Sequence, residues 1–121
     1  MPKRPPLILL VEDEPDLRDS ITDVIEEAGL RLEVTANYAE GAMLLNAPRP
    51  ALLIANLRLP GGGDGHRLAE LARRLGVPTL LISGHPEVIA EEGSGDVAFL
   101  EEPFRLEELL RVIRALIEDP F

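Results

Sequence analysis

Short runs of apolar residues alternate along the chain with longer stretches of helical periodicity. Three runs are continuously apolar, as strands covered on both faces must be, and are predicted to form the centre of a sheet: Leu7–Val11, Ala51–Ala55 and Thr79–Ile82. Two shorter and more mixed runs, Leu32–Thr35 and Val97–Leu100, suit edge strands with one side open to water. The alternation predicts five βα units around a parallel sheet.

Three stretches place apolar side chains on one helical face, namely residues 17–28, 68–75 and 106–117. Weaker helices are predicted over residues 38–46, where a glycine lowers the helix propensity, and over the short segment 86–92. The chain contains no internal repeat, low-complexity tract or interdomain linker.

Composition narrows the class of protein. The chain has 121 residues, of which 45% are apolar and 28% charged, so residues 1–121 are expected to form a single domain and a two-domain enzyme is excluded. The 12 Lys and Arg against 22 Asp and Glu leave a formal charge of −10, which repels nucleic-acid phosphates. The absence of cysteine removes disulfides, thiolate nucleophiles and Cys-ligated zinc, and it fits a reducing compartment. The basic start of the chain lacks the long apolar segment of a signal peptide, so we expect a cytoplasmic protein with no nucleic-acid or membrane partner.

Polar residues follow the predicted strands at the sheet edge where ligands bind in open parallel α/β sheets. They are Glu12, Asp13 and Glu14 after the first strand, Asn56 after the third, Ser83 after the fourth and Glu102 after the fifth. Taken singly, a polar residue at a strand end is most often a helix cap or a solvated turn. Their expected convergence on one edge favours a binding site.

At these strand ends the chain resembles the CheY-like receiver domains of response regulators, and the resemblance covers essentially the whole chain. The matching segments are Leu9–Pro15, Leu57–Pro60 followed by Asp64 and Gly65, Ile82–His85, Phe99, and Glu102–Phe104. The resemblance implies a flavodoxin-like (βα)5 α/β fold, with a five-stranded parallel sheet of order 2-1-3-4-5 and helices on both faces. It also implies that Glu12 and Asp13 correspond to the acidic pair that holds a divalent cation, and that Ser83 and Phe99 correspond to the switch positions.

Two residues depart from the family pattern. The resemblance implies a phosphoacceptor aspartate where the chain has Asn56, and a lysine where it has Glu102. A carboxamide is a poor nucleophile toward phosphorus, so the covalent step loses its attacking group. At the second position repulsion replaces an attraction worth roughly 4 kcal/mol for charges about 4 Å apart at an effective dielectric of about 20.

We therefore interpret the chain as an atypical receiver, a pseudo-receiver that is not an enzyme. It would serve two-component (phosphorelay) signal transduction as a phosphorylation-independent protein-interaction module. The alternative is a receiver that accepts a phosphoryl group on a non-standard carboxylate such as Glu102. The expected partners are a histidine kinase, an output domain or another regulator, or a second copy of the chain, bound through the last strand and its flanking helices.

No cofactor is required on this interpretation, but the predicted pocket holds oxygen ligands of the kind that Mg²⁺ or Ca²⁺ prefers. They are Glu12 or Asp13, the side-chain oxygen of Asn56 and a backbone carbonyl near Arg58, and cation binding is expected to be weak or absent. Because Glu12, Asp13 and Glu102 are expected to converge without a lysine, repulsion between like charges should raise the pKa of at least one of them.

Three further candidates are weaker. The glycine-rich segment 61–65 lacks the Lys-Ser/Thr of a phosphate loop and is predicted to be a turn. His66 and His85 match no metal-ligand spacing, and Ser83 has no recognisable histidine and acid partners of a serine hydrolase. Phe99 is as consistent with ordinary packing as with a switch.

Overall fold

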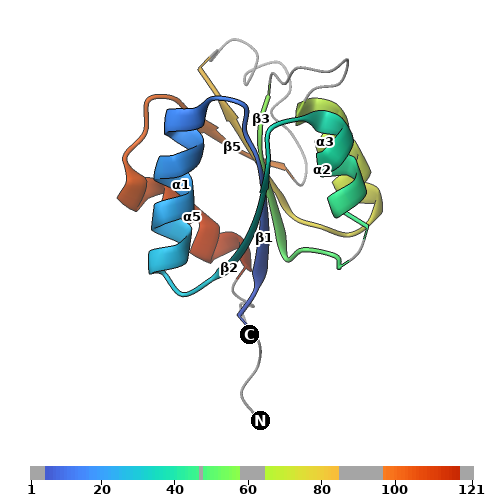
Figure 1. The fold of residues 1–121 in the computed structure, drawn as a ribbon, viewed down its shortest axis with the longest axis horizontal. Helices are drawn as coiled ribbons and strands as arrows, with labels where there is room; N and C mark the ends of the chain where they lie inside the picture. The colour runs from blue at the N-terminus through green and yellow to red at the C-terminus, as the bar shows by residue number, and fades with distance from the viewer. Residues whose placement is uncertain (1–4, 47, 58–64, 85–96, 118–121) are drawn as a thin grey trace.

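The computed structural model describes residues 5–46, 48–57, 65–84 and 97–117. Within these ranges five parallel strands form one sheet in the order β2-β1-β3-β4-β5 (Figure 1). The flavodoxin-like fold expected from the sequence is therefore confirmed. The helix predicted over residues 86–92 lies outside the described residues.

The strands are β1 (Leu7–Val11), β2 (Arg31–Thr35), β3 (Leu52–Asn56), β4 (Thr79–Ser83) and β5 (Val97–Glu101). The predicted central and edge strands are confirmed, and the differences lie at the strand ends. Asn56, Ser83 and Glu101 each extend a strand by one residue, because backbone pairing does not depend on the polarity of the side chain. In the other direction, β3 begins at Leu52 rather than Ala51, and β2 begins one residue earlier than predicted.

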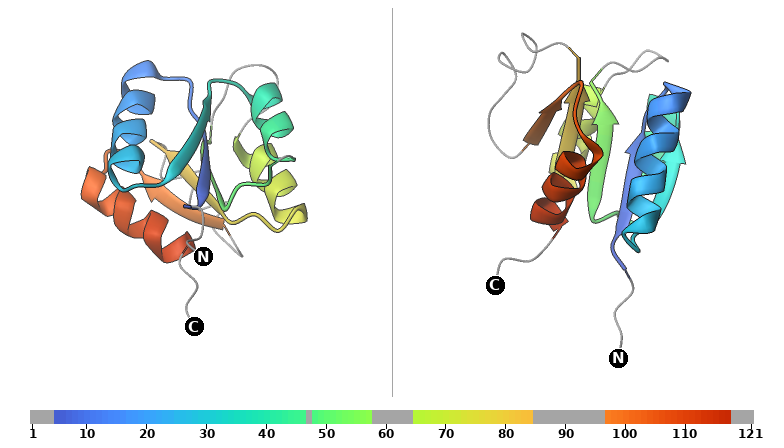
Figure 2. Two further views of the ribbon diagram at one scale, coloured as in Figure 1. Left: turned by 60° about the horizontal axis from the view of Figure 1, so that its bottom comes forward. Right: turned by 90° about the vertical axis from the view of Figure 1, so that its left-hand side faces the viewer.

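The described helices are α1 (Pro15–Glu27), α2 (Tyr38–Leu44), α3 (Gly65–Arg74) and α5 (Leu106–Ile117). Helices α1 and α5 cover one face of the sheet, and α2 and α3 cover the other (Figures 1 and 2). The three strongly periodic helices are confirmed, and the weaker helix over 38–46 is shorter than predicted. In the described part of the chain, no helix combines the length and apolar character that crossing a membrane requires.

Each face of the sheet has its own hydrophobic core, because successive side chains of a strand point to opposite faces. In β1, Ile8 and Leu10 pack under α1 and α5, whereas Leu9 and Val11 pack under α2 and α3. All four side chains are at most 1% exposed, and burial of one such side chain stabilises a fold by about 1.5–3 kcal/mol. Two packed faces therefore hold the strands, and with them the strand ends, in fixed positions.

Gly41 lets α2 lie close to the sheet. A Cβ atom at this position would stand 2.9 Å from Val11 Cγ2 and 3.4 Å from Leu68 Cδ1, so a side chain would push the helix away from β1. Gly41, which lowers the predicted helix propensity, is therefore the residue that allows α2 to pack closely against β1.

Candidate functional site

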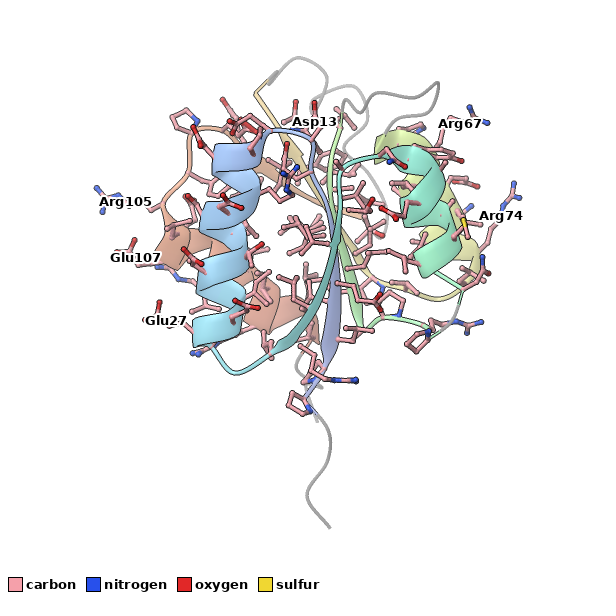
Figure 3. The ribbon with its side chains drawn as sticks, in the orientation of Figure 1. Asp13, Glu27, Arg67, Arg74, Arg105 and Glu107 are labelled. Carbon is pink, nitrogen blue, oxygen red and sulfur yellow. The ribbon has the colours of Figure 1, made fainter. Side chains whose placement is uncertain are left out.

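The carboxyl ends of the parallel strands lie at one edge of the sheet, the upper edge in Figure 1. Glu12 follows β1, Asn56 ends β3, Ser83 ends β4 and Glu102 follows β5. Asp13 is labelled at the same edge in Figure 3. The structure thus places these five residues along one edge, as the strand pattern predicts.

Glu12 is the buried acid of this edge, and hydrogen-bond donors surround its carboxylate. The residue is fully buried, with an exposed fraction of 0%. Asn56 Nδ2 donates to Glu12 Oε1 at 3.1 Å and to Oε2 at 3.2 Å, and the backbone N–H of Glu14 donates to Oε2 at 3.0 Å. Since a buried carboxylate is costly unless hydrogen bonds satisfy it, these donors are what make the burial of Glu12 tolerable.

Burial raises the pKa of the Glu12 carboxyl above its ordinary value. The hydrogen bonds from the Glu14 backbone and from Asn56 lower this pKa again, and the neighbouring charge of Asp13 raises it. The sequence predicted a raised pKa from repulsion among three carboxylates. The direction is confirmed, but the main cause is loss of solvation, and Glu102 is not among the groups that shift it.

Gly65, the first residue of α3, fixes the backbone of Asn56 from the other side. A Cβ atom on Gly65 would stand 2.1 Å from the carbonyl oxygen of Asn56 and 2.8 Å from its carbonyl carbon. The backbone N–H of Gly65 also donates to the carbonyl of Leu57 at 3.0 Å. The sequence marks Gly65 only as the end of a glycine-rich turn, and its contact with Asn56 becomes visible only in the folded chain.

Glu14 and Arg18 organise the start of α1 beside the site. The Glu14 carboxylate caps the helix by accepting the backbone N–H groups of Asp16 at 3.2 Å and Leu17 at 2.7 Å. Arg18 Nη1 donates to the backbone carbonyl of Glu12 at 3.0 Å. Sequence reasoning missed Arg18, because no motif distinguishes it from an ordinary charged residue of a helix surface.

The two predicted switch positions lie on neighbouring strands. Ser83 is 1% exposed, and its carbonyl accepts the backbone N–H of Glu102 at 2.8 Å. Phe99 is half-buried, stands in register with Leu81 and packs against the core under α2 and α3. A switching role for either residue stays a prediction.

The side chain of Glu102 lies in a more open environment than that of Glu12. It is half-buried, and a Cβ atom on Gly84 would stand 3.9 Å from Glu102 Oε1, which places the carboxylate beside the end of β4. It lines a groove of about 540 Å³ together with Glu14, Leu17, Ser20, Pro103, Phe104 and Leu106. The groove thus has apolar walls and two carboxylates.

The acidic and imidazole side chains of the described residues do not by themselves form a cation site. Among them, no group of three or more His, Asp or Glu side chains is placed to hold a metal ion. The expected convergence of Glu12, Asp13 and Glu102 on one point is therefore not found. Arg58, whose backbone carbonyl is an expected ligand, and His85 lie outside the described residues.

Comparison with known proteins gives a family match along most of the chain. Residues 8–114 match the model of the response regulator receiver domain. The nitrogen assimilation regulatory protein NtrX of Azorhizobium caulinodans is 32% identical over 118 residues, and nodulation protein W of Bradyrhizobium diazoefficiens is 33% identical over 119 residues. The alignments cover 92% and 93% of this chain but only 26% of NtrX and 51% of nodulation protein W, so both relatives are much longer.

Solved structures show the same fold. A response regulator receiver protein from Sinorhizobium medicae superposes with a TM-score of 0.86 at 26% identity, over 93% of this chain and 94% of that chain. The receiver domain of the sensor histidine kinase PA1611 from Pseudomonas aeruginosa, which has a magnesium ion coordinated in its active site cleft, superposes with a TM-score of 0.84 at 24% identity, over 93% and 98%. Both likenesses extend over 93% of this chain.

Proposed function

This chain belongs to the response regulator receiver domain family, and we propose that it serves two-component signalling as a pseudo-receiver, a protein-interaction module that works without being phosphorylated. The observation that carries the proposal is the position and bonding of Asn56. It ends the central strand β3, where the family resemblance implies the phosphoacceptor, and its amide nitrogen donates to the carboxylate of Glu12.

The chemistry of a carboxamide supports the proposal. A phosphoacceptor carboxylate forms a new O–P bond while the bond from phosphorus to the donor's leaving atom breaks, which is an oxygen in acetyl phosphate and a nitrogen in a phosphohistidine. The amide oxygen of Asn56 carries no full negative charge, and the lone pair of its nitrogen is delocalised, so neither atom is an effective attacking group. The nitrogen is moreover engaged as a hydrogen-bond donor to Glu12.

Glu102 supports the same conclusion independently. Phosphoryl transfer is catalysed mainly by positioning and by neutralising negative charge. At the position where the resemblance implies a lysine, Glu102 instead brings a carboxylate beside the end of β4. An incoming phosphoryl group would meet added repulsion there.

The proposed role is binding rather than catalysis, in the cytoplasm. The long relatives NtrX and nodulation protein W support a receiver that works beside other regulatory segments or proteins. The proposed partner is a histidine kinase, an output domain or another regulator, or a second copy of the chain. The proposed contact surface is β5 with its flanking helices, of which α5 is described.

The direct test is incubation with acetyl phosphate and magnesium followed by intact-mass measurement. Wild type should keep its mass, whereas Asn56→Asp should label weakly and Asn56→Asp combined with Glu102→Lys substantially, because residues that act as one unit are not additive. A receiver with an intact aspartate serves as the positive control for the donor.

An acid-labile phosphoryl adduct on wild type would contradict the proposal. Peptide mapping would then show whether the acceptor is another carboxylate, which is the alternative function. Intact mass before addition of the donor controls for deamidation of Asn56.

A further inference from the structure

The acidic site of this family is suited to a divalent cation, as the magnesium-bound receiver domain of PA1611 illustrates for that protein. We propose that in this chain the side-chain amide of Asn56 takes the place of the cation, so that the acidic site is complete without metal. The inference deepens the proposed function and rests on it in one respect, since both depend on the residue at position 56.

The first argument is the satisfaction of the buried acid. Glu12 is fully buried, and both of its carboxylate oxygens already face N–H donors: Asn56 reaches Oε1 and Oε2, and the Glu14 backbone reaches Oε2. A cation in such a site would offset the negative charge of the carboxylate, and the N–H dipoles do the same here with groups that belong to the chain.

The second argument is the chemistry of the donor set. Mg²⁺ and Ca²⁺ bind oxygen ligands, whereas an amide nitrogen with a delocalised lone pair is not a ligand for them. Asn56 presents Nδ2 to Glu12 at 3.1 and 3.2 Å. To ligate a cation shared with Glu12, it would have to turn its oxygen inward and lose both contacts.

The third argument is that the contact is held from several sides. Gly65 leaves no room for the backbone of Asn56 to retreat, because even a Cβ atom would collide with the Asn56 carbonyl. The backbone N–H of Glu12 donates to the Thr35 carbonyl at 3.0 Å, and the Thr35 hydroxyl is hydrogen-bonded to the side chain of Glu40. The amide–carboxylate contact is therefore one link in a set of hydrogen bonds that joins the ends of β3, β1 and β2.

The experiment compares wild type with Asn56→Asp in thermal unfolding with EDTA, Mg²⁺ or Ca²⁺, and measures Mn²⁺ binding by electron paramagnetic resonance. The midpoint of wild type should be the same in all three conditions. Asn56→Asp should melt lower than wild type in EDTA and recover with Mg²⁺, and it should bind Mn²⁺ at least about tenfold more tightly, the ratio that about 1.4 kcal/mol of added binding free energy gives.

Asp13→Asn is the matched control, because it removes one charge at the same edge but leaves the contact between Asn56 and Glu12 in place. This variant should remain insensitive to Mg²⁺. If Asn56→Asp does not fold, the Mn²⁺ titration of wild type decides alone: tight binding at the acidic edge overturns the inference, and its absence supports it.

A wild-type midpoint that rises with Mg²⁺ as much as that of Asn56→Asp would overturn the inference. The outcome is separable from that of the proposed function, because no phosphodonor is present. Wild type that binds Mg²⁺ but stays unlabelled by acetyl phosphate defeats only the inference, and wild type that is labelled without a metal-dependent midpoint defeats only the proposed function.

Discussion

The ends of β3 and β5 carry the two residues, Asn56 and Glu102, that we interpret as departures from the family pattern, and their surroundings differ. At the end of β3, Asn56 is bonded to a fully buried acid and pressed against Gly65. At the end of β5, Glu102 lies half-buried in a groove of about 540 Å³. Asn56 thus takes part in the packing of the fold, whereas Glu102 changes the charge of an open groove.

The difference teaches that two residues that we propose to oppose phosphoryl transfer, one by lacking a nucleophile and the other by adding negative charge, differ in their importance for the packing of the fold. A neutral donor next to a buried carboxylate removes an electrostatic problem that the family aspartate would create there. A carboxylate at a partly exposed position is solvated and demands little compensation. We therefore expect changes around Asn56 to affect stability, and changes at Glu102 to affect mainly the charge that a ligand meets.

The largest effect is expected from Gly65→Ala. The new Cβ would collide with backbone atoms of Asn56, which cannot move aside as a flexible side chain can, so the variant should lose about 3 kcal/mol of unfolding free energy. Urea unfolding measures the loss. Gly29→Ala is the control, because Gly29 has φ +82 but no atom within 4 Å of an added Cβ. Only the strain of the left-handed backbone should then lower the unfolding free energy, by about 1 kcal/mol. Equal losses in the two variants would show that α3 does not press on Asn56.

The next largest effect on stability distinguishes Asn56 from Glu102. Asn56→Ala should cost about 2 kcal/mol, because Glu12 stays buried after losing the amide donor. Glu102→Ala should change the unfolding free energy by about 0.5 kcal/mol or less, as substitutions outside the packed core usually do. Chemical denaturation of both variants in EDTA at one pH tests the contrast. A larger loss of unfolding free energy in Glu102→Ala than in Asn56→Ala would contradict this account.

A change of pH is expected to have a smaller effect on the unfolding free energy, through Glu12. Burial raises the pKa of Glu12 in the folded state above its ordinary value of 4.5, so the folded chain holds this proton more tightly than the unfolded chain. The corresponding stability is fully present below pH 4.5 and is lost as the pH rises through the raised pKa. Glu12→Gln should remove this slope, and the difference between the stability curves of wild type and variant measures it. Parallel curves would show that Glu12 does not titrate abnormally.

The smallest effect on stability is expected from Glu102→Lys alone, within about 0.5 kcal/mol. This variant should also stay unlabelled by acetyl phosphate, because it still lacks the nucleophile. Combined with Asn56→Asp it should raise labelling above that of Asn56→Asp alone. Glu101→Lys in the same background is the position control, since Glu101 is exposed at the end of β5. Equal gains in labelling from Glu102→Lys and Glu101→Lys would mean that any positive charge near this edge is enough to promote phosphorylation, whatever its position.

Much of the fold was predictable, because it follows from local pattern. Continuous apolar runs such as Leu7–Val11 identify strands covered on both faces, and the apolar spacing from Leu106 to Ile117 identifies a helix that covers one of them. The exact strand ends were not predictable, since Asn56 and Ser83 are polar yet continue the backbone ladder. The place of Gly41 also depended on the packing of α2 against Val11, which the sequence does not display.

The site was predictable as a set of positions and not as a set of contacts. Strand topology brings Glu12, Asn56 and Glu102 to one edge, but it does not say which side chains meet. The hydrogen bond between Asn56 and Glu12 joins residues 44 positions apart, and the sequence predicted only that both lie at this edge and not that they contact each other. The groove around Glu102 depends on how α1 and α5 pack, which the spacing of their apolar residues leaves open.

The most direct measurement is the NMR signal of the Asn56 side-chain amide, followed while Mg²⁺ and then acetyl phosphate are added. The account predicts amide protons that exchange slowly with water, show a coupling to the Glu12 carboxylate and keep their chemical shifts throughout. The side-chain amide of Asn46, which donates to the Ala42 carbonyl at 3.2 Å on the exposed side of the chain, provides an internal reference. Asn56 protons that exchange as fast as those of Asn46, or that shift on addition of Mg²⁺, would contradict the claim that the amide closes the acidic site.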